Sequence, residues 1–481
     1  MARDAEPALA AASLARGGRT NFAGFLLRLA ARFPFLLLAA RLYGAGELGE
    51  FAYAVMVVEF TAALATMGLK RGLSAEMARG GHPETHALAD GWLLGLGLAM
   101  AGSALLWLFP ALMFPAGADS GLRGLALIVP AIVLSDVSLA GLAFRHRIDV
   151  AVRARSLIEP WVLTIAATVL AFTAAKHWGL LLAYSLSLLA AAAASLLPAL
   201  RTFGLPRGWR PSAGRTWNMV WRNLPLAGAD LVEWSSRRLD LFILGRFAGP
   251  QEVGLYYAAQ QVASLAGKIR VSFDPILAPM LSKAVKDGRP GEAAAHLNQV
   301  GFWVLSFQLP VVLALGLPGE GVLGLFGPAF AAGALVLALL LTAELAAAGS
   351  SLAEMGLIYA RPRANLVIAA GGLALQAVLS LLLVPAFGGA GAAGALLLSL
   401  TAAAAARQLV LGRALGAGVG FWRWSLVGAG AAAFAFGLLL RALPELWEMI
   451  LLIPGVLLLF AGLMWRFGYG PDDRGLFRRG A

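Results

Sequence analysis

The chain has 481 residues, of which 60% are hydrophobic and only 13% are charged, and it contains no cysteine. A soluble domain carries about 25% charged residues, so this composition excludes a soluble enzyme, a secreted disulfide scaffold and a disordered chain. The net charge of +12 would suggest a nucleic-acid partner in a soluble protein. In a membrane protein it indicates instead which side of the bilayer holds the cations, and we expect no nucleic-acid partner.

Long apolar runs separated by short polar turns follow the N-terminal segment. A bilayer core requires about 20 apolar residues of helix, and fourteen runs of this kind are present. The predicted fold class is therefore an all-α integral membrane protein with about 14 transmembrane helices. The expected spans are 22–42, 48–68, 88–114, 123–144, 156–175, 178–200, 226–247, 252–272, 298–318, 328–358, 364–384, 390–411, 424–443 and 448–467.

The distribution of Lys and Arg predicts the orientation of these spans. Residues 1–21 contain no continuous apolar stretch, so we expect no cleaved signal peptide and place them in the cytoplasm. That side then holds 29 Lys and Arg residues, whereas the opposite side holds five. Because cytoplasmic loops are enriched in these residues, both termini are predicted to be cytoplasmic, in a bacterial inner membrane.

Residues 41–54 and 246–259 form a repeat with a constant offset of 205. The segments RLYGAGELGEFAYA and RFAGPQEVGLYYAA have five identical positions and one Phe/Tyr pair without a gap, although short Gly-rich and Ala-rich segments can also align by chance. Six predicted helices separate the two copies, so both enter the membrane in the same orientation. Parallel repeats of six helices are typical of secondary transporters.

The repeat predicts the domain organisation of the chain. We expect a cytoplasmic segment over 1–21, an N-lobe of helices 1–6 over 22–217, and a C-lobe of helices 7–12 over 218–411. Residues 412–481 would then hold helices 13 and 14 and a cytoplasmic tail, outside the repeat.

Several segments resemble polysaccharide flippases of the multidrug/oligosaccharidyl-lipid/polysaccharide (MOP) superfamily. They are LLLAARLYGAGELGEFAYA near the start, DPILAPMLSKAVKDGRPGEA, LPVVLALGLPGEGVLGLFGPAFAAGA and LVPAFGGAGAAGALLLS. The resemblance extends over nearly the whole chain and consists mostly of Gly, Pro and aromatic positions. It implies two MATE-like pseudo-symmetric six-helix lobes around a central cavity, with helices 1, 2, 7 and 8 lining that cavity.

Four arginines lie deep inside the expected spans, where a charge costs roughly 2.5–3.5 kcal/mol. Arg28 and Arg32 share one face of the first helix, and Arg237 and Arg238 lie in the seventh. The repeat offset pairs Arg32 with Arg237. Because a guanidinium remains charged and binds phosphate oxygens bidentately, we predict that all four contact the diphosphate of a polyprenyl-linked sugar. The alternative is a structural ion pair, for example between Glu233 and Arg237.

Acidic residues within the spans are candidates for coupling transport to an ion. Asp240 has Arg237 three residues away, and Glu159 lies near the cytoplasmic rim. Glu59 and Asp136 have no obvious partner nearby in the sequence, so these two are the predicted coupling residues. Gln260 is a candidate for contacting sugar hydroxyls, although polar residues also join helices to one another.

The remaining motifs predict no catalytic, metal or cofactor site. His82 and His86 have helical ligand spacing, but Pro83 interrupts that helix. No Walker A motif is present. The predicted function is the flipping of a polyprenyl-diphosphate-linked oligosaccharide for exopolysaccharide or lipopolysaccharide assembly by alternating access, with membrane lipids, glycosyltransferases and a polysaccharide polymerase as partners. A MATE-type drug/cation antiporter is the alternative, and the short outer loops argue against an enzyme.

Overall fold

The computed structural model describes residues 2–115, 120–271, 273–441, 445–470 and 473, all lying in helices or in the turns between them. For 2–32, 120–122, 237, 271, 274–276 and 445–447 it describes the backbone alone. The chain divides into two compact units, 1–238 and 239–481.

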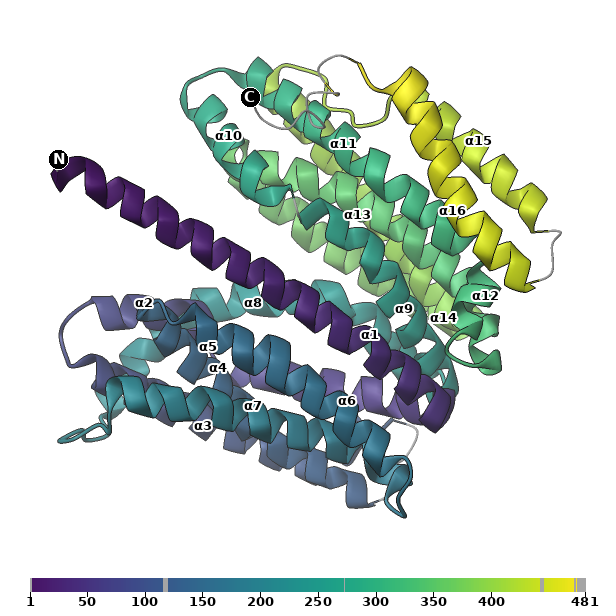
Figure 1. The fold of residues 1–481 in the computed structure, drawn as a ribbon. Helices are drawn as coiled ribbons and strands as arrows, with labels where there is room; N and C mark the ends of the chain where they lie inside the picture. Colours follow the sequence, from purple (N-terminus) through teal and green to yellow (C-terminus); the bar gives the residue numbers. More distant parts are fainter. Residues whose placement is uncertain (1, 116–119, 272, 442–444, 471–472, 474–481) are drawn as a thin grey trace. The chain divides into compact units, whose positions relative to one another are not determined.

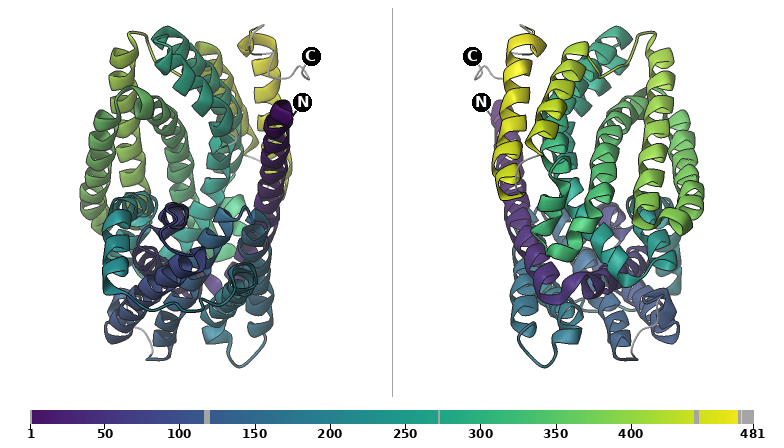
Figure 2. Two further views of the ribbon diagram at one scale, coloured as in Figure 1. Left: turned by 90° about the vertical axis from the view of Figure 1, so that its left-hand side faces the viewer. Right: turned by 90° about the vertical axis from the view of Figure 1, so that its right-hand side faces the viewer.

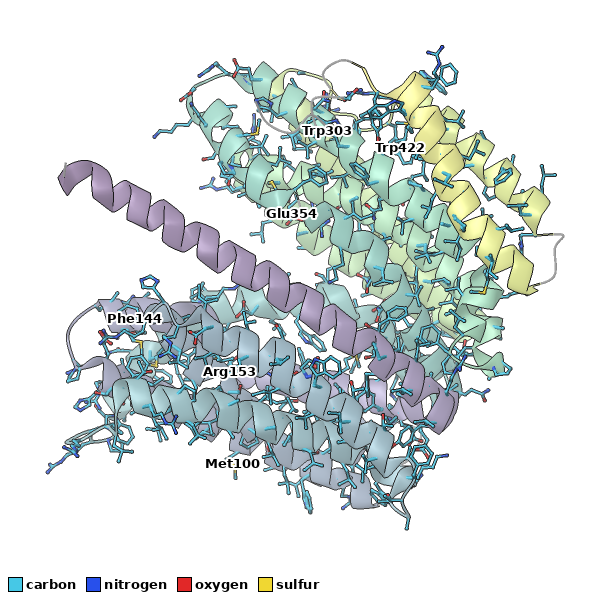
Figure 3. All side chains as sticks on the ribbon, in the orientation of Figure 1. Met100, Phe144, Arg153, Trp303, Glu354 and Trp422 are labelled. Carbon is cyan, nitrogen blue, oxygen red and sulfur yellow. The ribbon has the colours of Figure 1, made fainter. Side chains whose placement is uncertain are left out.

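The first unit consists of helices that run back and forth along a common direction (Figure 1). Its elements are α1 (Ala2–Ala65), α2 (Leu69–Ala78), α3 (Glu84–Leu108), α4 (Val129–Phe144), α5 (Ile148–Val152), α6 (Glu159–Leu170), α7 (Gly179–Phe203) and most of α8 (Ala213–Phe247). Apolar side chains cover its outer surface, as for Met100, which is 59% exposed (Figure 3). An exposed apolar surface of this kind is stable against lipid but not against water.

The second unit repeats this plan and adds a further helix pair at its C-terminal end. Its elements are α9 (Pro250–Val271), α10 (Asp274–Lys286), α11 (Pro290–Gly316), α12 (Gly319–Gly324), α13 (Ala334–Ala360), α14 (Pro362–Leu415), α15 (Trp424–Leu440) and α16 (Glu445–Leu463). The added pair, α15 and α16, is drawn in yellow in Figure 2. It packs on α11 through a core that includes Leu305, Leu426 and Val456.

Two glycines divide long helices into pairs of spans. Gly44 (φ 85°) separates two helical segments within α1, and Gly388 (φ 53°) does the same within α14. L-residues rarely adopt these φ values, so glycine permits each bend. Among the described residues, eight helical segments are long and apolar enough to cross a membrane. The two bent segments each correspond to two expected spans.

All fourteen expected spans correspond to helices of the structure. The spans 156–175, 226–247, 252–272 and 424–443 correspond to α6, α8, α9 and α15, which are shorter or more polar than the others. The expected spans 88–114 and 156–175 were too long at their C-terminal ends, because α3 ends at Leu108 and α6 at Leu170. Short irregular turns replace the last predicted residues.

The positions of the elements follow the repeat offset of 205. The short helix α2 begins at Leu69 and α10 at Asp274, and α4 begins at Val129 and α13 at Ala334, so both pairs have the offset of 205. The repeat-related acids also have equivalent roles. Glu47 lies 3.0 Å from His177 in the turn before α7, and Glu252 accepts a hydrogen bond of 2.6 Å from the backbone N–H of Gly389 at the bend of α14.

The bend at Gly388 is expected to be sensitive to substitution. In a Gly388→Ala variant the new methyl group would overlap the Glu252 carboxylate, at a φ of 53° that alanine disfavours. We expect a loss of about 1–3 kcal/mol in unfolding free energy, measured by denaturation of the purified protein in detergent. Gly394→Ala in the same helix is the control, because the site is open. Equal stability of the two variants would contradict the assigned strain.

Candidate functional site

Glu59 and Arg238, from the two predicted classes of functional residue, lie close together in the first unit. The Arg238 guanidinium is 3.7 Å from the Glu59 carboxylate, and the two side chains are 25% and 39% exposed. The hydroxyl of Tyr184 lies 3.5 Å from the other carboxylate oxygen. Both distances are at the long limit for such contacts. Because the contact is long and the two side chains are partly exposed, a stronger ligand of Arg238 or of Glu59 can displace the other residue of the pair.

The other three arginines predicted to bind the diphosphate are Arg28, Arg32 and Arg237. Their backbones are helical, in α1 and α8, but their side chains lie outside the described residues. Their role as diphosphate ligands stays a prediction. The alternative pairing of Glu233 with Arg237 now has a competitor, because Arg71 of α2 lies 2.7 Å from Glu233.

Asp136, which has no obvious partner nearby in the sequence, has two cationic partners in the structure. Lys70 of α2 lies 2.9 Å from one carboxylate oxygen of Asp136, and Arg155 contacts the other. Arg155 also lies 2.7 Å from Glu159 at the start of α6. The partners are 66 and 19 residues from Asp136 in sequence, so local spacing could not reveal them. Two cations neutralise this carboxylate and join α2, α4 and α6, which favours a structural role.

Asp240 forms a buried hydrogen-bonded group in the second unit. It is 1% exposed and accepts hydrogen bonds from the Tyr256 hydroxyl (2.5 Å), the Gln260 amide (3.1 Å) and the backbone N–H of Leu241 (2.8 Å). The sequence interpretation related Asp240 to Arg237 and overlooked Tyr256. The helical spacing of Tyr256 and Gln260, one turn apart, was the available signal.

The repeat gives these positions apolar counterparts in the first unit. Asp240 and Tyr256 correspond, at the offset of 205, to Phe35 and Phe51, whose ring centroids lie 5.8 Å apart. The same contact between two helices is thus aromatic in one half and polar in the other. Two related halves have acquired different chemistry at one position, and the polar version is the candidate for binding or transferring a cation.

A second polar network of the second unit joins α9, α13 and α14. Arg407 donates a hydrogen bond of 2.6 Å to the Ser350 hydroxyl and lies 3.2 Å from Glu354, while Arg270 donates to the hydroxyl of the adjacent Ser351. Figure 3 marks Glu354 within this unit. The sequence interpretation counted both arginines on the cytoplasmic side, and the expected span 390–411 contains Arg407. In the structure Arg407 is only 7% exposed and lies inside α14.

Arg270 differs from the other charged groups of this network. It is half-buried on α9, and in the part of the chain that the structure describes its guanidinium has a hydroxyl partner and no carboxylate within ion-pair distance. A guanidinium has five N–H donors, so most of them remain available to an anion. The structure therefore adds Arg270 to the cationic residues that sequence reasoning proposed.

Within the described residues no group of three or more His, Asp or Glu side chains is arranged to hold a metal ion. His86 contacts the backbone carbonyl of Arg207 at 3.1 Å.

The architecture defines the class of protein. The chain is a multi-pass membrane protein with the helical fold of MOP-superfamily transporters. It is similar to the structure described as lipid II flippase MurJ in an inward closed conformation, with a TM-score of 0.76 at 14% identity over 93% of this chain and 98% of that one. An inward-facing MATE family multidrug resistance transporter matches with a TM-score of 0.65 at 16% identity, over 81% and 98% of the chains. A MOP superfamily transporter from Pyrococcus furiosus matches with 0.56 at 15%, over 84% and 95%.

The sequence also identifies the family. Residues 38–317, more than half of the chain, match the family described as Polysaccharide biosynthesis protein, and the chain belongs to this family. It matches no curated protein sequence. The predicted family and fold class are thereby confirmed. The structural likenesses, all below 25% identity, establish the fold alone.

The Arg407 network is expected to contribute to stability through the pairing of a buried charge. Glu354→Gln should lower the unfolding free energy by about 3 kcal/mol, because it leaves the buried Arg407 guanidinium without its carboxylate partner. Adding Arg407→Gln should recover about 1 kcal/mol of that loss. Denaturation of the wild type, both single variants and the double variant in detergent measures the coupling. Strict additivity of the two substitutions would contradict the pairing.

Proposed function

We propose that this protein flips a polyprenyl-diphosphate-linked oligosaccharide from the cytoplasmic to the outer leaflet of a bacterial inner membrane, by alternating access. The product would enter exopolysaccharide or lipopolysaccharide assembly. Membership of a polysaccharide biosynthesis family and a MOP transporter fold support a transport step in that process. The orientation, with both termini cytoplasmic, rests on the bias of Lys and Arg among the loops.

The observation that carries the proposal is the presence of guanidinium groups with spare donors on membrane helices. Arg270 has only a hydroxyl partner among the described residues, and Arg238 has a carboxylate 3.7 Å away. A diphosphate accepts charge-assisted, bidentate hydrogen bonds from groups of this type. In this proposal Arg32 and Arg237 hold the diphosphate, and Arg28 and Arg238 complete its binding.

The loose pair of Arg238 and Glu59 suggests how substrate and ion would be coupled. Phosphate oxygens and the Glu59 carboxylate would compete for the same guanidinium. Binding of the diphosphate would release the Glu59 carboxylate from Arg238 and make it available to a coupling ion. Transport of that ion, or of net charge through the membrane potential at about 2.3 kcal/mol per charge per 100 mV, would then drive the cycle. Asp136, which has two cationic partners, is the weaker coupling candidate.

Glycosyltransferases that build the lipid-linked sugar and a polymerase that consumes it are the expected partners of this step. A MATE-type drug/cation antiporter is the second candidate function. The buried Asp240 with its Tyr256 and Gln260 donors favours it, because organic cations require an acid at depth. Ethidium efflux driven by sodium or protons in proteoliposomes, without lipid flipping, would support the antiporter.

Replacing Arg32 and Arg237 together with alanine should abolish complementation of a flippase-deficient strain at normal membrane levels. The physical reason is the loss of two phosphate-binding groups, each worth about 1.5–3 kcal/mol. Arg41→Ala with Arg246→Ala is the matched control, because these arginines are also related by the offset of 205 but lie at the predicted outer ends of their spans. Full activity of the Arg32/Arg237 variant would refute the assignment.

Glu59→Gln should separate binding from coupling. Substrate affinity is expected to stay the same or rise a few-fold, because Arg238 loses its competing carboxylate. Flipping driven by a pH gradient in proteoliposomes should fall at least tenfold. Glu292→Gln, an exposed acid paired with Arg289 in the α10–α11 turn, is the control. A normal response to the pH gradient in Glu59→Gln would remove Glu59 as the coupling residue.

A further inference from the structure

A pocket of about 660 Å³ lies at the C-terminal end of α14, in the second unit. Its lining comes from the last turns of α14 and from the segment that follows, namely Ala405, Gln408, Leu409, Gly412, Arg413 and residues 416–419. Small-molecule sites in proteins have volumes of about 300–1,000 Å³. This pocket is distant in sequence from the arginines proposed to hold the transported diphosphate.

The segment that follows α14 forms one wall of the pocket, and contacts with α11 hold this segment in place. Asn298 donates a hydrogen bond of 2.9 Å to the carbonyl of Gly418 and accepts one of 2.9 Å from the backbone N–H of Gly420. Phe421 is 1% exposed and packs against Gly301, where a methyl group would overlap its ring. The wall is therefore set before any ligand arrives, which lowers the entropic cost of binding.

The chemistry of the lining favours an anion. Arg413 is exposed, and within the described part of the chain no carboxylate lies within ion-pair distance of it. The other arginine of this segment, Arg423, is already bound to Asp473 at 2.8 Å. The lining contains no Asp or Glu. The backbone N–H groups of Gly416 and Ala417 donate hydrogen bonds to the Gly412 carbonyl. These hydrogen bonds reduce the partial negative charge that the C-terminal end of α14 presents to the pocket.

The surroundings of the pocket favour a lipid as the source of that anion. Leu409 is 63% exposed on the pocket wall, and Trp422 and Trp424 next to the segment are 53% and 90% exposed. Figure 3 places Trp422 near the start of α15. Tryptophan is enriched at the boundary between hydrocarbon and headgroups. An apolar wall beside an available guanidinium matches an acyl chain beside a phosphate.

We propose that this pocket binds an anionic phospholipid of the cytoplasmic leaflet, with its headgroup phosphate on Arg413 and Gln408 and its acyl chain along Leu409. The lipid is a bound partner of the second unit and is not transported. The proposal is independent of the substrate assigned above, because it uses none of the same residues.

Native mass spectrometry of the delipidated, full-length protein tests this site with added phosphatidylglycerol. Arg413→Gln should weaken the apparent affinity about tenfold, and Ala405→Trp, which fills the pocket, should do the same. Arg363→Gln is the matched control, because Arg363 is exposed near the other end of the same helix. It should change the affinity less than twofold.

Two further ligands distinguish the source of the phosphate. Phosphatidylcholine should bind at least several-fold more weakly than phosphatidylglycerol, and inorganic phosphate at the same concentration should leave the protein's melting temperature unchanged. An equal, Arg413-dependent stabilisation by inorganic phosphate would overturn the lipid assignment. Wild-type affinity for phosphatidylglycerol in both Arg413→Gln and Ala405→Trp would overturn the site itself.

Discussion

The free-energy cost of a charged group in hydrocarbon shapes this protein more than any other constraint. A helix of the required length satisfies its own backbone, but each ionisable side chain within it requires a partner. The structure supplies those partners from helices far away in the sequence, as Lys70 and Arg155 do for Asp136 and as Glu354 does for Arg407. Charged residues therefore act in the interior as connections between helices, and those that retain spare hydrogen-bonding capacity are candidates for function.

The two related halves apply this constraint differently. The first unit joins α2, α4 and α6 through ion pairs around Asp136. The second unit joins its helices through serine hydroxyls, as for Ser350 and Ser351, and through the buried Asp240 group. An aromatic contact between Phe35 and Phe51 replaces that group in the first unit. The two units keep equivalent element positions but differ in their polar interactions. Each unit can therefore serve a different function.

Such divergence fits the proposed lipid-linked oligosaccharide, which is divided into an anionic, an apolar and a polar part. Guanidinium groups are suited to a diphosphate because they remain charged at any depth. A carboxylate that loosely pairs with one of them, as Glu59 does with Arg238, can respond to the arrival of the anion. Tightly saturated acids such as Asp136 cannot respond in this way, since two cations already hold them. The strength of each pair thus separates structural from responsive residues.

The sequence alone determined the membrane class, the positions of the fourteen spans, the parallel repeat and the family resemblance, because these follow from hydropathy, local spacing and short glycine and proline patterns. It also located Arg238 and Glu59, because a charge inside an apolar run is conspicuous. It could not determine that Arg238 and Glu59 lie close together, that Asp136 is neutralised, or that Tyr256 completes the Asp240 group. Those facts depend on which helices become neighbours. Only tertiary packing decides this, since apolar helices of similar composition could pack against one another in many ways.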